Sequence, residues 1–193
     1  KGKKIIEIGC AKGNMLDIIE EAKMEAYGLE YSSESIKIAK DANRKVIKGF
    51  IEDINEIESG PFQGFVCFNF LEHLPNPKLA INKIYNNLSS HGVGLITVPN
   101  LDYLLNTKCF YEFVADHLSY FTIDTLKNAF NNNKFDVLEC SLINNENDIM
   151  IIVKKNPNKK IEKDLKIQKI DLKDNYREVE TLITNFKKII QDY

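Results

Sequence analysis

Apolar runs of strand length alternate with segments of helical period along most of the chain, and this alternation limits the fold more than any other feature. Five runs are predicted strands, at residues 4–8, 26–30, 46–50, 65–70 and 93–98. Between several of them, apolar residues recur every three or four positions, as on one face of an amphipathic helix. Because parallel strands need a long crossover connection, usually a helix, the alternation predicts an α/β domain with a mostly parallel sheet and helices on both faces.

Local start and stop signals delimit two later helices. Asn76 followed by Pro77 predicts a helix start, because asparagine caps free amides and proline at the first helical position loses no hydrogen bond. His91 and Gly92 are predicted to end that helix, before the fifth strand. Thr122 is predicted to cap a further helix.

The last third of the chain departs from the simple alternation. Runs at residues 135–140 and 149–153 predict a closing antiparallel pair at the sheet edge, so one globular domain is expected over residues 1–154. Lysine and asparagine dominate residues 155–175, which predicts a charged linker. Apolar residues return at helical spacing in 176–193 and predict a C-terminal amphipathic helix. That helix would dock on the domain, pair two copies in a homodimer or lead into a further domain.

The composition narrows the classes of partner. With 26 basic and 28 acidic side chains, the net charge of −2 gives no overall attraction to nucleic acid or to an anionic membrane. No apolar run approaches the roughly 20 residues of a membrane span and no leader is recognisable, so a cytoplasmic chain is expected. The 4 cysteines form no CxxC pair, which predicts neither a zinc cage nor a disulfide framework. Because the chain opens with Lys1, we expect an N-terminally truncated piece of a longer polypeptide.

The strongest chemical signal is the segment Glu7-Ile8-Gly9-Cys10-Ala11-Lys12-Gly13, between the first predicted strand and a helix. Small residues there let the backbone turn tightly and approach a ligand at the carboxyl edge of the sheet. A dinucleotide fingerprint would need glycine where Ala11 stands and glycine or alanine at Asn14. The segment instead resembles the first motif of class I S-adenosylmethionine-dependent methyltransferases.

This resemblance implies a Rossmann-like fold, with S-adenosylmethionine as cofactor and S-adenosylhomocysteine as product. It places Gly9, Cys10, Ala11 and Gly13 against the methionine part of the cofactor, with Glu7 bonding or positioning the loop. The family usually has a third glycine where Ala11 stands, a departure that a small side chain tolerates.

Two further segments complete the cofactor site that the resemblance implies. Glu30 ends the second predicted strand, where a carboxylate can accept hydrogen bonds from both ribose hydroxyls, and Tyr31 follows it. Ile51 and Glu52, after the third strand, resemble the segment beside the adenine, although many relatives carry an acidic residue where Phe50 stands.

Residues 65–77 resemble the fourth-strand motif of small-molecule methyltransferases, in which a strand leads into Leu-Glu-His-Leu and a proline-led helix. By this resemblance Asn69 and Phe70 border the cofactor. His73 points towards the cleft as a second candidate base or, alternatively, caps the loop after the strand.

Residues 116–122 resemble the Glu-His-x-Ser-Tyr segment of nucleotide-sugar C-methyltransferases, with Asp116 in place of the glutamate. Histidine is the natural base near neutral pH and a neighbouring carboxylate can orient it, so His117 is the first candidate base and Asp116 its partner. Tyr120, and Asn100 after the fifth strand, are predicted to contact the acceptor. The alternative is that His117 and Tyr120 only hold the loop against the sheet.

These features together predict methyl transfer from S-adenosylmethionine to a small metabolite, by resemblance a sugar or nucleotide-sugar, with no metal. O- or N-methylation of another small molecule stays open, as does a catalytically silent domain kept for binding or assembly. Nucleic-acid methylation lacks both a basic stripe and an Asn/Asp-Pro-Pro-aromatic motif. The acceptor and the methylated atom stay undetermined, because specificity lies in loops that vary on a shared fold.

Overall fold

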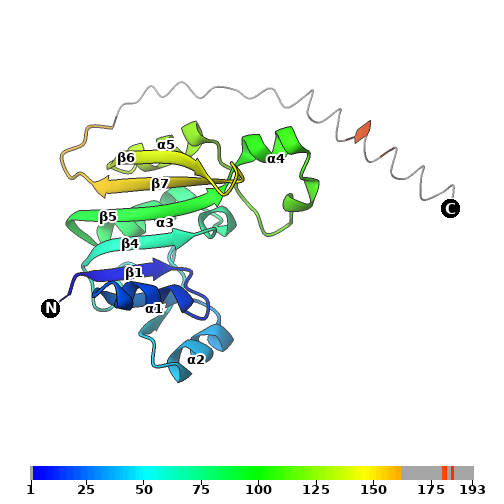
Figure 1. Ribbon diagram of the computed structural model, residues 1–193. Helices are drawn as coiled ribbons and strands as arrows, with labels where there is room; N and C mark the ends of the chain where they lie inside the picture. The colour runs from blue at the N-terminus through cyan, green and yellow to red at the C-terminus, as the bar shows by residue number, and fades with distance from the viewer. Residues whose placement is uncertain (1, 162–179, 182–183, 185–193) are drawn as a thin grey trace.

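One seven-stranded sheet forms the centre of the computed structural model, which describes residues 2–161, 180, 181 and 184. The strand order is β3-β2-β1-β4-β5-β7-β6, and β7 alone runs against the direction of the others. This confirms the predicted mostly parallel sheet with an antiparallel edge (Figure 1). The strands are β1 Lys4–Ile8, β2 Glu25–Glu30, β3 Val46–Lys48, β4 Phe62–Phe68, β5 Leu88–Pro99, β6 Phe135–Ile143 and β7 Asp148–Lys155.

Helices cover both faces of the sheet, as predicted. Helices α1 and α2 pack on β1 to β3 around one apolar cluster, whereas α3 and α5 cover the other face of the sheet around a larger one. Helix α4 lies beyond the carboxyl ends of the parallel strands (Figure 1). The helices are α1 Asn14–Glu21, α2 Ser33–Asp41, α3 Pro77–Asn86, α4 Leu101–Thr107 and α5 Ile123–Asn131, with short 3-10 turns η1 Leu71–His73 and η2 Phe110–Glu112.

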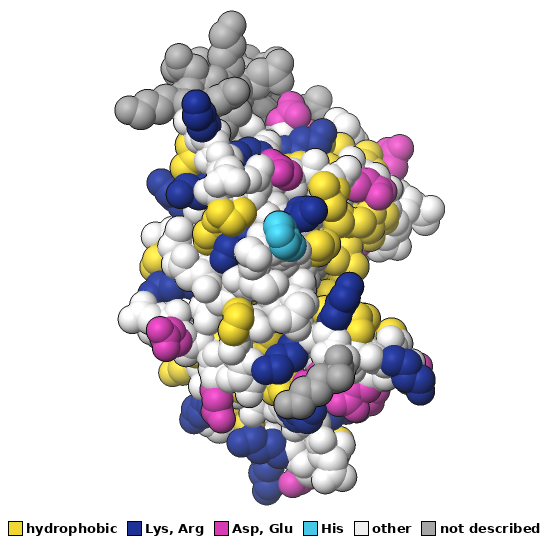
Figure 2. Space-filling model, turned by 90° about the vertical axis from the view of Figure 1, so that its left-hand side faces the viewer, with side chains coloured by type: hydrophobic (Ala, Val, Ile, Leu, Met, Phe, Trp, Pro, Cys, Tyr) yellow, Lys and Arg dark blue, Asp and Glu magenta, His cyan; other side chains and the backbone are white. Residues whose placement is uncertain are grey.

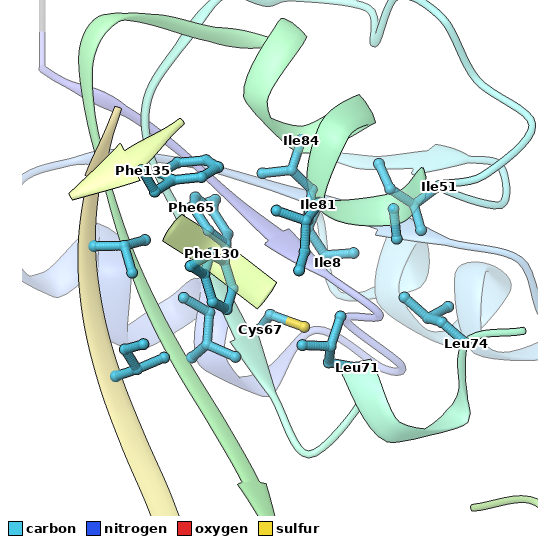
Figure 3. Close-up of a cluster of buried hydrophobic side chains, with 14 of the residues drawn as sticks. Ile8, Ile51, Phe65, Cys67, Leu71, Leu74, Ile81, Ile84, Phe130 and Phe135 are labelled. Atoms are coloured by element: carbon cyan, nitrogen blue, oxygen red, sulfur yellow. The ribbon is translucent and has the colours of Figure 1, made fainter. Parts of the chain in front are cut away.

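The larger core is built around aromatic side chains from three elements. Phe135 of β6 meets Phe130 of α5 and Phe65 of β4 at ring-centroid distances of 5.6 and 6.1 Å. Ile81 and Ile84 of α3 complete the layer, as Figure 3 shows. Burial of such side chains supplies most of the favourable free energy of folding and fixes α3 and α5 on the sheet.

Two predicted helix starts are confirmed in atomic detail. The Asn76 side chain accepts a hydrogen bond from the backbone N–H of Leu79, and Pro77 stands at the first helical position of α3. Thr122 caps α5 in a reciprocal capping box with Thr125. Both signals are local, because a cap and its amides lie within one helical turn.

The predicted boundary between α3 and the fifth strand was wrong. Helix α3 ends at Asn86, and β5 begins at Leu88, so His91 and Gly92 lie inside the strand. The reason is long-range: Leu88 pairs with Phe62, and the register then shifts before the next pair. A local reading of His91-Gly92 as a stop signal could not detect this irregular pairing.

Other strand boundaries and one helix also differ from the expectation. Strand β3 ends two residues earlier, at Lys48, and β4 spans Phe62–Phe68 rather than residues 65–70. Helix α4 was not predicted, although Asn100 caps it. Most of the predicted linker and C-terminal helix lies outside the described residues, so the homodimer and further-domain alternatives stay predictions.

The side chain of Asn87 joins α3 to the loop before β4. Its amide oxygen accepts from the N–H of Ile57 at 2.7 Å, and its nitrogen donates to the carbonyls of Asn55 and Lys83 at 3.1 and 2.9 Å. Asn87 is 7% exposed, so water cannot replace these bonds without a local opening. The amide therefore holds together two segments that the sequence separates by about 30 residues.

We expect Asn87→Ala to lower the free energy of unfolding by about 1–3 kcal/mol, because it leaves the buried Ile57 amide without an acceptor. Urea denaturation at neutral pH measures this loss. The neighbouring exposed Asn86, changed to Ala, is the matched control and should change stability by less than about 0.5 kcal/mol. Equal effects of the two changes would contradict the assigned role of Asn87.

Candidate functional site

Predicted site segments from distant parts of the sequence meet at the carboxyl edge of the sheet. The loops that follow β1, β2, β3 and β4 all leave the sheet on this side because these strands are parallel. Strands β2 and β4 lie on opposite sides of β1, so the chain reverses its direction across the sheet there. Open α/β sheets bind ligands at such a reversal.

The loop after β1 approaches the fourth-strand segment closely. Gly9 and Gly13 have positive φ values of 73° and 80°, and Ala11 has a φ of 46°. A Cβ atom on Gly9 would lie 2.4 Å from the Phe70 ring, so only glycine fits there. Cys10 contributes backbone to this loop, whereas its side chain is buried in the cluster under α1 and α2.

The Glu30 side chain accepts hydrogen bonds from the loop after β1 and from the residues that precede α2. Its carboxylate accepts from the N–H groups of Ala11 and Tyr31 at 2.9 Å each, and of Ser32 at 2.7 Å. Ser32 is also the N-cap of α2, so one side chain connects the first loop to the start of that helix. Each carboxylate oxygen has more than one acceptor position, which leaves capacity for a ligand hydroxyl.

A pocket of about 240 Å³ opens beside Glu30. Its volume is slightly below the roughly 300–1,000 Å³ of typical ligand pockets, which suits one part of a larger ligand. A carboxylate next to apolar side chains matches a nucleoside, because the ribose diol needs acceptors and the base needs flat contacts. The lining residues are Ile8, Gly9, Leu29, Glu30, Tyr31, Ser32, Gly49, Phe50, Ile51 and Phe70.

Glu7 is a buried carboxylate with one oxygen free of any hydrogen bond. It is 7% exposed, and its Oε2 has no partner among the described residues. Burial, followed by the negative charge of Glu30, raises the pKa of Glu7 to about 7. A buried, unpaired acceptor next to the glycine loop fits an ammonium group, which would supply both the missing donor and the compensating charge.

The remaining predicted cofactor residues divide between pocket and scaffold. Ile51 is 1% exposed and lines the pocket, whereas Glu52 Oε1 accepts the N–H of Asn76 at 2.8 Å and so holds the start of α3. Asn69 has a positive φ of 43° and its Oδ1 accepts the Thr97 hydroxyl at 2.7 Å. Tyr31 is 67% exposed at the pocket rim, and its ring lies 6.1 Å from that of Phe50.

The two candidate bases lie together, although 44 positions separate them in the sequence. The rings of His73 and His117 are 4.8 Å apart in an edge-to-face arrangement. The predicted pairing of Asp116 with His117 is not what the structure shows. His73 Nδ1 lies 2.9 Å from the backbone carbonyl of Asp116 and 3.6 Å from its Oδ2. Asp116 therefore contacts the second candidate base rather than the first.

Sequence reasoning missed Glu72 as a member of this site. Glu72 is 2% exposed, and one donor or acceptor atom each from Glu72, His73 and His117 lies within 4.8 Å of the other two. Such a set can share protons or bind a divalent cation. The only available signal was its place beside His73 in the Leu-Glu-His-Leu motif, because the approach of His117 is tertiary.

The two predicted acceptor contacts differ in their surroundings. The ring of Tyr120 lies 6.0 Å from that of His117, and its hydroxyl donates to the Glu112 carbonyl at 3.5 Å. Asn100 is 4% exposed, and its amide accepts from Asp102 N–H and donates to the Glu146 carbonyl. Asn100 thus serves as a helix cap and lines a separate pocket of about 280 Å³.

Two further observations concern the surface charge and the helices. Figure 2 shows basic and acidic side chains interspersed over the face that carries the amino ends of the parallel strands. Among the described residues, no helix combines the length and the apolar character needed to cross a membrane.

Comparison with known proteins identifies the architecture. The family described as "Methyltransferase domain" matches residues 1–140. A methyltransferase from Haloferax volcanii, solved in complex with the Trm112 methyltransferase activator, has a TM-score of 0.71 at 12% identity, over 81% of this chain and 83% of that one. Magnesium protoporphyrin IX methyltransferase from Synechocystis, solved with bound S-adenosylhomocysteine, has a TM-score of 0.65 at 11% identity, over 80% and 75% of the two chains.

Curated relatives match about half of the chain or less. Ubiquinone biosynthesis O-methyltransferase from Actinobacillus pleuropneumoniae is 24% identical over 109 residues, which are 51% of this chain and 47% of that protein. The enzyme of the same name from Dechloromonas aromatica is 28% identical over 86 residues, 42% of this chain and 37% of that protein. The chain thus spans about half the length, or less, of the curated relatives it matches.

Burial of Glu7 predicts a pH dependence of stability. Its pKa is raised from 4.5 to about 7 in the folded chain, so the folded state binds the proton more tightly than the unfolded state. The free energy of unfolding should therefore fall by about 1–3 kcal/mol as the pH rises from about 4.5 through 7. Glu72, whose pKa burial also raises to about 7, adds to the same fall.

Urea denaturation at several pH values between 4.5 and 8 measures this effect. Glu7→Gln should reduce the fall, because an amide does not ionise, whereas the exposed Glu34, changed to Gln, is the matched control and should leave it unchanged. A stability curve of Glu7→Gln that runs parallel to the wild-type curve would contradict the assignment.

Proposed function

Because the chain belongs to the methyltransferase-domain family, whose cofactor is S-adenosylmethionine, we propose that it methylates a small-molecule acceptor at the carboxyl edge of its sheet. The observation that carries this proposal is the pocket bounded by Gly9, Glu30 and Phe70, with the unpaired Glu7 carboxylate beside it. The Glu30 carboxylate suits the ribose diol of the cofactor, the apolar lining suits its flat base, and the Glu7 carboxylate suits its ammonium group.

Glu30 and the loop after β3 would hold the nucleoside. The Glu30 carboxylate lines the pocket and would accept a ribose hydroxyl at the remaining acceptor position of Oε2, because Oε1 already accepts two N–H groups and Oε2 accepts one. Phe50 and Ile51 offer apolar contact to the adenine. The amino-acid end would then lie along the glycine loop, where Glu7 accepts from the ammonium group.

The chemistry assigned to the protein is positioning and proton removal. The bound sulfonium supplies an already activated methyl group. The chain must align the acceptor with it and, for a hydroxyl or carbon acid, accept a proton. His117 is the proposed base, supported by its position beside His73 and Tyr120 on the segment between α4 and α5.

The proposed acceptor is a small metabolite with an acidic O–H or C–H group. The likeness of residues 116–122 to nucleotide-sugar C-methyltransferases favours a sugar. A second candidate is a phenolic acceptor. It is supported by exposed apolar side chains beside His117, with Phe113, Val114 and Leu118 at 40, 40 and 55% exposure, and by the names of the O-methyltransferase relatives.

We expect Glu30→Ala to weaken binding of both S-adenosylmethionine and S-adenosylhomocysteine by about 1–3 kcal/mol, or about 5- to 150-fold, because both ligands present the same ribose. Calorimetry measures both affinities, with Glu34→Gln as the matched control outside the pocket. Unchanged affinity would remove Glu30 from the site. Tight cofactor binding without turnover on any of a broad panel of sugars and phenols would favour a binding module instead.

His117→Asn should leave the affinity for S-adenosylhomocysteine within about twofold but slow methyl transfer by about a hundredfold or more, the usual scale of general-base catalysis. Single-turnover transfer to the best acceptor of the panel, measured beside the cofactor titration, separates the two effects. Transfer at near wild-type rate would mean that His117 only holds its loop against the sheet.

A further inference from the structure

Among the described residues, three buried side-chain atoms have no hydrogen-bond partner: Oε2 of Glu7, Oε2 of Glu72 and Nδ1 of His117. The atoms of Glu72 and His117 belong to the same site. An unpaired buried carboxylate oxygen costs free energy, as does an unpaired buried ring nitrogen. Their occurrence together, on an acceptor and on a group that can donate, points to one interaction between them.

The backbone holds the two side chains in mutual reach. The carbonyl of Glu72 accepts the N–H groups of Leu118 and Ser119, at 2.8 and 3.0 Å. These bonds attach the segment that carries His117 directly to the turn η1 that carries Glu72. One donor or acceptor atom each from Glu72, His73 and His117 lies within 4.8 Å of the other two, so a carboxylate oxygen and an imidazole nitrogen lie close together.

Neighbouring groups are engaged elsewhere. Asp116 contacts His73 through its carbonyl and its carboxylate. Asp148, the other acid whose charge acts on Glu72, accepts from the side chains of Asn144 and Asn147. The His73 Nε2 lies 3.9 Å from Glu72 Oε1, which leaves Oε2 for another donor. Among the described carboxylates near His117, Glu72 is therefore the one with a buried oxygen that has no hydrogen bond.

We propose that Glu72 is the positioning residue for His117, accepting a hydrogen bond from its Nδ1–H and thereby presenting the Nε2 lone pair to the acceptor. This inference rests on the proposed function of His117 as base. In the step, the O–H or C–H bond of the acceptor would break and the proton would bond to Nε2. The acceptor atom would bond to the methyl group as the methyl–sulfur bond breaks, and the electron pair of that bond would stay on the sulfur of the leaving S-adenosylhomocysteine. The resulting imidazolium is stabilised by the negative charge of the Glu72 carboxylate.

The structural part of the proposal can be tested without an acceptor. The chain has only 3 histidines, so 15N-labelled imidazole resonances can be assigned by single substitutions. We expect the full chain to show His117 as the Nδ1–H tautomer with a downfield, hydrogen-bonded proton. Glu72→Gln should abolish this signature, whereas Asp116→Asn should perturb His73 and leave His117 unchanged. A His117 signature that survives Glu72→Gln, or disappears in Asp116→Asn, would overturn the proposal.

The catalytic part is tested by rates. Glu72→Gln should slow single-turnover methyl transfer by about 10- to 100-fold at unchanged S-adenosylhomocysteine affinity, and Glu72→Asp should recover part of the rate because it restores a carboxylate. Far-ultraviolet circular dichroism and thermal melting of each variant establish that it folds. Wild-type transfer by a folded Glu72→Gln variant would overturn the proposal.

Titration with Zn²⁺ and Mn²⁺ tests whether Glu72 and His117 bind a divalent cation instead of each other. Stoichiometric binding of either ion by the wild type, lost in Glu72→Gln and in His117→Asn, would overturn the hydrogen-bond assignment in favour of a cation site. Absence of such binding supports the Glu72–His117 pair. If no acceptor is methylated at all, the proposed function fails while the resonance test of the pair still stands.

Discussion

The hydrogen bonds of the Glu30 carboxylate are the constraint on which the cofactor side of this molecule depends. One side chain at the end of β2 accepts amides from the loop after β1 and from the start of α2. It thus fixes the positions of two segments that must both border a ligand. Charge-assisted hydrogen bonds of this kind are stronger than neutral ones, which allows a loop with several positive φ angles to keep one conformation.

A second constraint is the burial of carboxylates at the site. Glu7 lies in β1, and Glu72 lies in the turn η1 that follows the neighbouring strand β4. They are 7 and 2% exposed, and each keeps one oxygen without a partner among the described residues. Burial of such groups opposes folding at neutral pH, as the raised pKa of each shows. The apolar layers on both faces of the sheet offset this cost. The buried carboxylates at the proposed site therefore lower the free energy of unfolding, whereas the apolar core raises it.

Sequence reasoning succeeded where the deciding contacts are local and failed where they are not. The caps at Asn76 and Thr122 were predicted because each bonds amides within its own helical turn. The start of β5 was misplaced because it depends on pairing with Phe62, about 26 residues earlier. The glycine loop was found from its spacing alone, whereas the reason for glycine at position 9, the approach of the Phe70 ring, appeared only in the folded chain.

The sequence by itself determined the sheet class, the crossover helices and the glycine loop with its family resemblance. Apolar periodicity and the small residues that permit a tight turn can both be recognised within short stretches of sequence. It also selected His117, His73 and Asp116 as candidates. Only the tertiary structure decided that Asp116 contacts His73, and that Glu72 lies close to both histidines. The physical reason is that adjacency in the chain does not decide which side chains meet. Asp116 and His117 are neighbours in sequence, but the hydrogen bonds of Leu118 and Ser119 to the Glu72 carbonyl bring the segment of His117 against Glu72, while Asp116 lies beside His73.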